Sequence, residues 1–418
     1  MTTELAWQLL CSALVLFMTP GLAFFYGGLV KAKSVVSMMM LSFGSIAVVT
    51  ILYVLYGGTG IAGNGTSGGS KYFGNPFEDF GMTKLVKSAG SGDAANLFGS
   101  HAFLVAFCII TVALVSGGIA DRARFWPWML YAAFFATFVV FPTFRWIWGI
   151  DADGNFYGWL ANNVYGMGGA LDWAGGTVIH QSAGAAALAL ALVLGRRKIG
   201  FSKEEAIPHN VPLVLIGAAI LWFGWYGFNT GVFGADEGQT SLIFLNTLLC
   251  PAAALLGWIV AEQFKEGKPT AVGAASGIVT GLVAITPACA FITPVWSLIL
   301  GLVSGAVCAY SIDLKFKLGF DDSLDVVGIH LVAGFIGCVW IGLFGSETLT
   351  PNGSVFFGGS AKQLGAQVFS SLSVIVFSFV VSYIIGMAIE KTIGFRVKEE
   401  DEVAGLDLVL HGEGYALD

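Results

Sequence analysis

Long apolar runs alternate with short polar segments along almost the whole chain, from Leu5 to about residue 390. A bilayer is crossed by about 20 predominantly apolar residues in a helix, and the runs reach that length. We therefore predict eleven membrane-spanning helices. The predicted spans are 5–30, 35–57, 98–119, 126–146, 171–194, 211–231, 241–263, 271–290, 294–313, 324–346 and 365–390.

The composition supports this interpretation and sets the fold class. Hydrophobic residues make up 56% of the 418 residues, charged residues only 11%, and the mean hydropathy is +0.79. Soluble domains carry about 25% charged residues. The 57 glycines suit close packing of helices in lipid. The chain is thus predicted to be an all-α polytopic membrane protein, with a transmembrane domain at 1–391 and a polar tail at 392–418.

Basic residues predict the orientation, because cytoplasmic loops are enriched in Lys and Arg. An odd number of spans places the two termini on opposite sides. If the N-terminus is outside, five basic residues face outward: Lys71, Lys84, Lys87, Arg145 and Lys362. The other fifteen of the 20 then face inward, from Lys31 to Lys398. This bias predicts an N-out, C-in arrangement.

Charge and cysteine usage exclude several function classes. The net charge of −7 and the pI near 5.2 argue against a nucleic-acid partner. All six cysteines fall inside apolar runs and none has a metal-binding spacing, so we interpret them as buried free thiols. We find no nucleophile–base constellation, no phosphate-binding glycine loop and no metal ligand set. The sequence therefore predicts neither an enzyme nor a cofactor.

Two ionisable residues mark the fifth span. The stretch 172–184 reads D-W-A-G-G-T-V-I-H-Q-S-A-G, with Asp172 at its start and His180 eight residues further on. An ionisable group at that depth should face protein or a water-filled path, because hydrocarbon does not solvate it. Asp172 either only caps the helix, which Asp does well, or caps it and also shapes a cation site.

A second histidine lies at the matching position of the tenth span. His330 shares the pattern H-x-x-A-G with His180, 150 residues later, and segments 24–28 and 225–229 also resemble each other. Each histidine lies on the last helix of a five-span half, so the halves would form an inverted repeat with the site between them near the midplane. Three interpretations stay open: two core histidines bonded across helices, a metal site, or a proton-handling pair in a central pore.

These motifs resemble the ammonium transporter family (Amt/MEP/Rh), and its Amt branch more than its Rh branch. The stretch at 172–184 is similar to that family's signature, and further similar segments follow in order along the membrane domain. They are T-P-G-L-A-F-F-Y-G-G at 19–28, D-R-A-R-F at 121–125, G-W-Y-G-F-N at 224–229 and G-L-D with H-G-E at 405–413.

The resemblance implies a role for individual residues. His180 and His330 match the twin histidines of the hydrophobic pore, and Asp172 matches the aspartate beneath an outer recruitment site. Five aromatic residues match further positions of that site and pore. Trp148 matches the ring that covers the site, and Phe107 matches the ring that binds the cation and gates the pore with Phe228. Phe103 and Trp225 match rings that line the vestibule and the pore.

One position departs from the family's pattern. Three residues beyond Asn229 the family often has a serine, whereas this chain has Val232. A valine side chain neither donates nor accepts a hydrogen bond. Either Thr230 or water would substitute, or aromatic rings alone would hold the cation.

The predicted function is ammonium transport. Aromatic faces attract a cation, and dehydrating an ion inside an apolar pore is expensive, but ammonium can give up its proton and cross as ammonia. The proton would follow along the imidazoles, which makes uptake electrogenic. The alternatives are a passive, Rh-like ammonia channel and an ammonium sensor that signals through the tail. The resemblance further implies a homotrimer in the bacterial inner membrane, ammonium and possible methylammonium as substrates, contact with membrane lipid, and a PII-type signal protein at the cytosolic face.

Overall fold

The computed structural model describes residues 2–63, 69–87, 89, 92–150, 156–161, 165–203, 207–232 and 234–415. Within these residues the fold is helical, and the only β-type pairing consists of isolated bridges. The first helices are α1 (Thr3–Leu29), α2 (Val35–Leu52), α3 (Thr83–Lys87), α4 (Gly92–Val115), α5 (Phe125–Phe135), α6 (Phe141–Trp148), α7 (Ser182–Leu194) and α8 (Val211–Thr230). The later ones are α9 (Glu237–Glu266), α10 (Ala271–Ile285), α11 (Pro294–Ser311), α12 (Leu314–Leu318), α13 (Val332–Phe344), α14 (Lys362–Thr392), α15 (Glu399–Ala404) and α16 (Leu406–His411).

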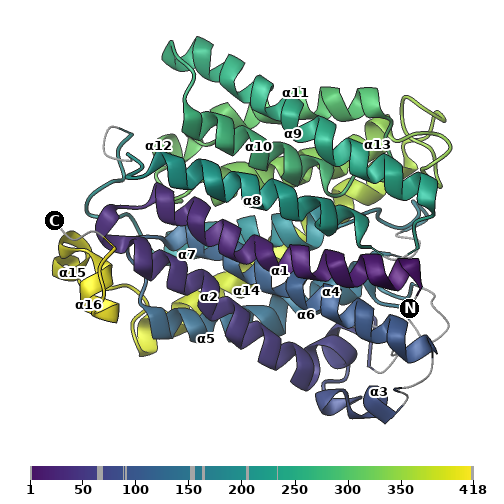
Figure 1. The fold of residues 1–418 in the computed structure, drawn as a ribbon, viewed down its shortest axis with the longest axis horizontal. Coiled ribbons are helices and arrows are strands. Elements are labelled where there is room, and N and C mark those ends of the chain that lie inside the picture. The colour runs from purple at the N-terminus through teal and green to yellow at the C-terminus, as the bar shows by residue number, and fades with distance from the viewer. Residues whose placement is uncertain are drawn as a thin grey trace.

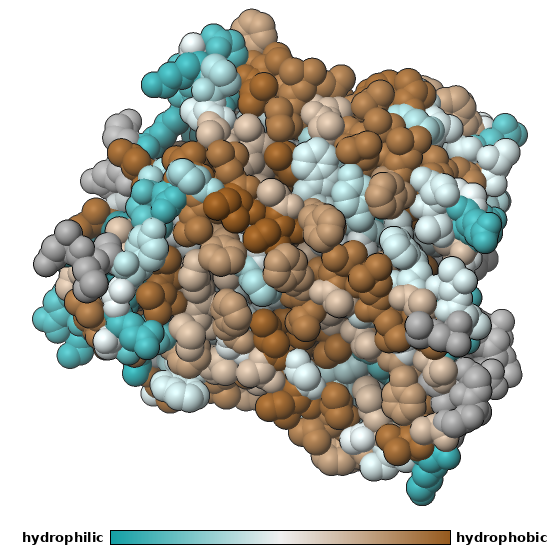
Figure 2. All heavy atoms as spheres, in the orientation of Figure 1, coloured by the Kyte–Doolittle hydropathy of each residue, from teal (hydrophilic) through white to brown (hydrophobic). Residues whose placement is uncertain are grey.

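The long helices run side by side along the horizontal direction of Figure 1, and the two termini lie at opposite ends of the bundle. Among the described residues, ten helical segments are long and apolar enough to cross a membrane. The segment predicted at 271–290 is represented by the shorter apolar helix α10. Brown, apolar side chains cover the middle of the face shown in Figure 2, and hydrophilic ones gather toward its two ends. The chain is a multi-pass membrane protein.

Two predicted spans are shorter than expected because each contains a non-helical segment. The prediction that helix begins at 171 is wrong: residues 171–175 are not helical, and Gly175 has φ +115°. The prediction that helix continues from 286 to 290 is also wrong, because α10 ends at Ile285. The two segments pair with each other, since the N–H of Trp173 donates to Pro287 O at 3.2 Å and that of Ala174 donates to Thr286 O at 3.2 Å.

The two helices that carry the histidines each begin with a π-helical turn, which is wider than an α-helical one. Residues Gly176–Gln181 (η6), before α7, and Val327–Leu331 (η7), before α13, are π-helical. The π-helical turn is uncommon and is frequently found at functional sites in proteins, although the segments Tyr53–Ala62 and Ala136–Val140 of this chain are π-helical as well. His180 lies in the first of these turns and His330 in the second.

A close glycine contact brings α1 and α8 together. A Cβ atom on Gly217 of α8 would lie 2.3 Å from the backbone nitrogen of Phe25 in α1. Only glycine therefore fits at this crossing. In lipid, such close backbone approach replaces the hydrophobic drive that packs soluble helices.

The tail packs on the membrane domain as far as residue 415. Its composition alone predicted neither docking nor disorder. The Asp407 carboxylate accepts hydrogen bonds from the N–H groups of Val36 and Ser37, at 3.1 and 2.7 Å, near the start of α2. Glu402 accepts one from the N–H of Lys198 at 2.6 Å and pairs with Arg396 at 2.6 Å. Helices α15 and α16 lie at the end of the bundle opposite the N-terminus (Figure 1).

Candidate functional site

The two predicted histidines meet at the centre of the bundle. Nδ1 of His180 and Nδ1 of His330 are 3.3 Å apart, and the ring centroids are 5.3 Å apart at 27°. Both side chains are buried. A hydrogen bond between these two nitrogens needs one ring to donate and the other to accept, which two neutral imidazoles of opposite tautomer provide. The Nε2 atom of His180 is buried without a partner.

A narrow apolar cavity runs along the histidine pair. Its volume is about 10 Å³, close to the minimum that holds one water-sized molecule. Trp225 and Phe228 of α8 line it beside the imidazoles, and the ring of Trp225 stacks on His180 at 5.4 Å and 20°. The Trp225 N–H points elsewhere, donating to Thr286 Oγ1 at 2.8 Å. The cavity therefore presents ring surfaces and two imidazoles to anything inside it.

Two stacked phenyl rings separate this cavity from a larger one. Phe107 of α4 lies on Phe228 with centroids 4.1 Å apart and an interplanar angle of 11°. Phe107 lines the larger cavity and Phe228 lines the narrow one. The pair forms the partition between the two spaces.

The larger cavity, which we call the vestibule, has a volume of about 430 Å³. Phe103, Phe107, Trp148 and Asp172 all line it, so the structure brings the four residues predicted for the outer cation site to one place. The rings of Phe103 and Phe107 are 4.4 Å apart, and those of Phe107 and Trp148 are 6.1 Å apart and nearly perpendicular. The vestibule is thus a chamber with aromatic walls above the phenyl partition.

Asp172 is a buried carboxylate that organises the start of the helix carrying His180. Its Oδ1 accepts from the N–H groups of Gly175 and Gly176, at 2.9 and 2.6 Å, and its Oδ2 accepts from Thr177 and Val178, at 2.8 and 3.3 Å. The first backbone N–H groups of a helix have no partner within the helix, and an Asp side chain can accept their hydrogen bonds. Its backbone oxygen accepts from Trp148 Nε1 at 2.8 Å, so the same residue also fixes the indole over the vestibule.

Val232 lines the vestibule, as expected for a residue three beyond Asn229. Thr230, considered above as its polar substitute, is buried, and its hydroxyl donates to Tyr226 O at 2.6 Å within its own helix. Thr230 is not among the lining residues of the vestibule. The wall at this point is apolar.

Sequence reasoning missed Asp322. Its position relative to His330 is the same as the position of Asp172 relative to His180. Asp322 also lies eight residues before its histidine, and its carboxylate accepts from the N–H groups of Val326 and Val327 at 3.1 and 2.7 Å. Burial raises the pKa of Asp322 to about 6, although the nearby Lys315 ammonium opposes this. The shared spacing Asp-x₇-His was visible in the sequence and could have revealed it.

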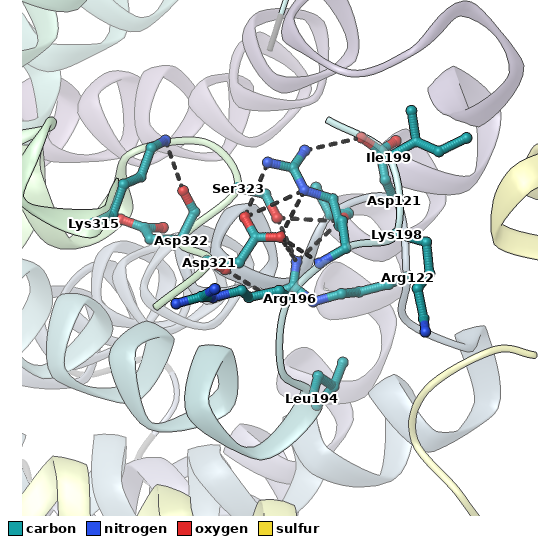
Figure 3. A network of polar contacts seen from close by, with 12 residues as sticks. Asp121, Arg122, Leu194, Arg196, Lys198, Ile199, Lys315, Asp321, Asp322 and Ser323 are labelled. Atoms are coloured by element: carbon teal, nitrogen blue, oxygen red, sulfur yellow. Dashed lines mark hydrogen bonds and ion pairs between the residues drawn. The ribbon is translucent and has the colours of Figure 1, made fainter. Parts of the chain in front are cut away.

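A buried ion network holds the loop that contains Asp322. Asp321 is the centre of the contacts drawn in Figure 3. Arg197 Nε donates to Asp321 Oδ2 at 2.9 Å, and Arg122 donates to the backbone oxygen of Asp321 at 2.6 Å. Burial raises the pKa of Asp321, but the two guanidiniums outweigh this and hold its pKa below the ordinary value. The network joins the loops that follow α4, α7 and α12.

No cluster of three or more potential metal ligands occurs within the described parts of the chain. The three remaining histidines line neither of these two cavities. His101 bonds to Tyr53 at 3.0 Å, His209 bonds to Val30 O at 2.8 Å, and His411 lies at the end of α16.

Comparison with known proteins identifies similar chains of nearly the same length. The family model described as Ammonium Transporter Family matches residues 6–415. The chain is 44% identical to an ammonium transporter of Mycobacterium tuberculosis, over 99% of this chain and 90% of that one. It is 40% identical to an ammonium transporter of Bacillus subtilis, over 96% of each.

Solved structures show the same fold. A protein described as a sensor Amt protein superposes with a TM-score of 0.87 at 25% identity, covering 98% of both chains. Saccharomyces cerevisiae Mep2 superposes with a TM-score of 0.84 at 31% identity, covering 95% of this chain and 88% of that one.

Proposed function

The chain belongs to the ammonium transporter family, and from this premise we propose that it binds NH4+ in the vestibule, removes a proton and passes NH3 along the histidine pair. Its relatives are transporters rather than enzymes. The observation that carries the proposal is the 3.3 Å contact between His180 and His330 beside a cavity only large enough for one small molecule.

The outer cation site consists of Phe103, Phe107, Trp148 and Asp172. A cation over the face of an aromatic ring is attracted by the ring quadrupole. The buried Asp172 carboxylate adds a negative charge beneath the rings. Together they support capture of a monovalent cation before it reaches the phenyl partition.

The gate and pore lining consist of Phe107, Phe228 and Trp225, with the two histidines as the proton relay. A bare cation in this cavity would lose its water shell and gain few polar partners, which is costly. Potassium has no way to reduce that loss. Ammonium reduces it by giving up a proton, so selectivity comes from its chemistry rather than from pore width.

The imidazole pair carries the proton separately. One neutral ring donates to the other, so a proton accepted at one ring can leave from the other after the tautomers exchange. Two charged rings at this distance would repel strongly, so the pair holds one extra proton at most. Net movement of NH3 plus H+ makes transport electrogenic.

The architecture we propose is eleven spans in a five-plus-five inverted repeat, with the N-terminus outside and the C-terminus in the cytosol. The matching Asp172–His180 and Asp322–His330 pairs support the repeat. Asp172 lines the vestibule, and Asp322 directly follows Asp321 of the ion network. The transmembrane domain is residues 1–391 and the cytosolic tail is 392–418.

We propose a homotrimer in the bacterial inner membrane, in contact with lipid and with one pore per subunit. A PII-type signal protein at the cytosolic face is part of the same proposal, and the hydrogen bonds by which Asp407 and Glu402 dock the tail on the membrane domain support it. Methylammonium is a candidate second substrate.

A second candidate function is ammonium sensing. Two observations favour it: the sensor Amt protein superposes over 98% of both chains, and the tail is tied by hydrogen bonds to α2 and to the loop after α7. A passive ammonia channel is the third candidate, but the aromatic walls and the carboxylate of the vestibule favour a charged ligand.

Current measurements in proteoliposomes on a solid support separate these functions. An electrogenic transporter gives a transient current on an ammonium jump and none on a potassium jump. A passive channel moves ammonia, seen as internal alkalinisation, without current. A sensor gives neither at a useful rate and does not restore growth of a transport-deficient host on low ammonium.

A further inference from the structure

The vestibule residues considered so far leave ammonium short of hydrogen-bond acceptors. Each N–H group of the cation loses a water partner on entry, and a hydrogen bond that is not replaced is costly to lose. The Asp172 carboxylate already accepts from four backbone N–H groups, which occupies its lone pairs. Val232 has no polar side-chain atom, and the Thr230 hydroxyl is used inside its own helix. A further acceptor in the wall would replace part of the lost hydration.

Gln8 of α1 carries an unused acceptor at this wall. Gln8 lines the vestibule, and only 3% of its surface is exposed. Its side-chain oxygen, Oε1, is buried and has no hydrogen-bond partner. Among the described lining residues, no other buried side-chain nitrogen or oxygen lacks a partner. Buried polar atoms are paired in nearly all cases, so an unpaired one beside a cavity indicates a place for a ligand or a water.

The neighbours of the Gln8 amide fix which end is the oxygen. Its Nε2 faces the backbone oxygen of Gly231 at 3.5 Å. Turning the amide over would bring two acceptors together there, which is unfavourable. On the other side, a Cβ atom on Gly99 of α4 would lie 2.6 Å from Oε1. The absence of a side chain at Gly99 therefore leaves the room that the oxygen occupies.

Gln8 also lies beside the position at which the chain departs from the family's pattern. Gly231, whose carbonyl the amide faces, directly precedes Val232. A Cβ atom on Gly231 would lie 2.5 Å from the ring of Phe103. Gln8, Phe103 and Val232 all line the vestibule. The amide is thus next to the ring and the valine in one part of the wall.

We propose that Gln8 is a specificity-determining residue whose Oε1 accepts a hydrogen bond from NH4+, in place of the hydroxyl that Val232 lacks. The inference rests on the proposed outer cation site and adds to it a side chain from α1. The aromatic rings attract the charge of the cation, and Asp172 adds a negative charge, but neither reads an N–H group. The amide oxygen does, because it is an acceptor and carries no net charge.

Competition dialysis measures this site without requiring transport. The detergent-purified, full-length protein is dialysed against radiolabelled methylammonium, which keeps N–H donors, and ammonium is added as the competitor. Gln8→Met keeps the length of the side chain and removes the amide. It should weaken ammonium binding about tenfold, as expected for one lost hydrogen bond to a charged group. Gln263→Met is the matched control, because Gln263 is exposed near the end of α9, and it should bind as the wild type does.

A rescue experiment separates an acceptor from a side chain that only packs helices. Val232→Ser, added to Gln8→Met, should restore ammonium binding to within about threefold of the wild type, because the two acceptors substitute for each other. In the wild-type background the same substitution should have a smaller effect. Gly99→Ala gives a second route, since its methyl group displaces Oε1 without removing it and should also weaken ammonium binding.

The outcomes distinguish this proposal from the proposed function. Weaker binding in Gln8→Met that Val232→Ser reverses supports the acceptor, whether or not the wild type gives an ammonium current. Wild-type binding in Gln8→Met, or weaker binding that Val232→Ser leaves unchanged, overturns the acceptor and leaves electrogenic transport standing. A wild type without saturable binding overturns the outer cation site and the acceptor together.

Discussion

Asp172 lies eight residues before His180, and Asp322 lies eight residues before His330. Each aspartate accepts hydrogen bonds from the first backbone N–H groups of the helix that carries its histidine. At the residue scale, this pairing does more than cap two helices. Each carboxylate fixes the start of a π-helical turn, and the turn fixes the direction of the imidazole. The aspartates are therefore positioning residues for the histidine pair.

The two aspartates differ in what surrounds them, and Asp322 offers a pH-dependent test. Its pKa is raised from 3.8 to about 6, so between these values the native state keeps a proton that the unfolded state has released. Stability then falls as pH rises through this window. Asn does not titrate, so the free energy of unfolding of Asp322→Asn does not fall in this way. Relative to the wild type, this variant should gain about 1 kcal/mol in the free energy of unfolding between about pH 5 and about pH 7.

Thermal unfolding of both proteins in detergent at the two pH values measures this difference. Lys362→Gln, at the start of α14, serves as the control for an unrelated loss of charge. A stability difference between Asp322→Asn and wild type that does not change with pH contradicts the assignment.

At the element scale, the repeated pattern H-x-x-A-G has a physical explanation. A Cβ atom on Gly184 of α7 would lie 2.6 Å from Leu331 N, and one on Gly334 of α13 would lie 2.9 Å from Gly176 O. Each glycine therefore lets its helix approach the π-helical turn of the other. This mutual approach is what brings His180 and His330 within 3.3 Å.

Gly184→Ala should consequently move the two helices apart. The added methyl group meets backbone atoms that cannot rotate away, so we expect a loss of about 1–3 kcal/mol in stability and a larger loss of ammonium current. Thermal unfolding and proteoliposome current measure the two effects. Gly238→Ala is the matched control, since its Cβ would meet only a flexible Asp236 oxygen at 3.3 Å. Wild-type current in Gly184→Ala would show that the close crossing is not needed.

The element scale also shows what a sequence can and cannot predict here. Hydrophobic run length predicted the apolar helices, because a helix in lipid must satisfy its own backbone. It could not predict that 171–175 and 286–290 leave the helix, because their N–H and C=O groups pair with each other across 110 or more residues. The meeting of the histidines was predictable from the repeat. In contrast, Trp173 lies within one of these unwound segments and Phe291 directly follows the other, and both line the vestibule.

At the scale of the whole molecule, the structure places the tail and the N-terminus at opposite ends of the bundle (Figure 1). The tail's docking could not be read from its polar composition, since it depends on single contacts such as Asp407 with the start of α2. The basic residues predict that the tail end is cytosolic. The bundle geometry itself is compatible with either orientation in the membrane.

Cysteine labelling in intact cells tests the orientation. Lys84 and Lys398 have side chains that are 68% and 79% exposed, and all six native cysteines are buried. A membrane-impermeant maleimide should label Lys84→Cys in intact cells and Lys398→Cys only after permeabilisation. The reverse pattern contradicts the N-out, C-in arrangement.

The central claim is that His180 and His330 form one proton-transferring unit in the conduction path, and the current of single histidine variants tests it most directly. Proteoliposomes with the wild type should give a current on an ammonium jump and none on a potassium jump. His180→Ala and His330→Ala, reconstituted at equal density and still binding ammonium in the vestibule, should each lose that current. An undiminished ammonium-specific current in His180→Ala would contradict the claim.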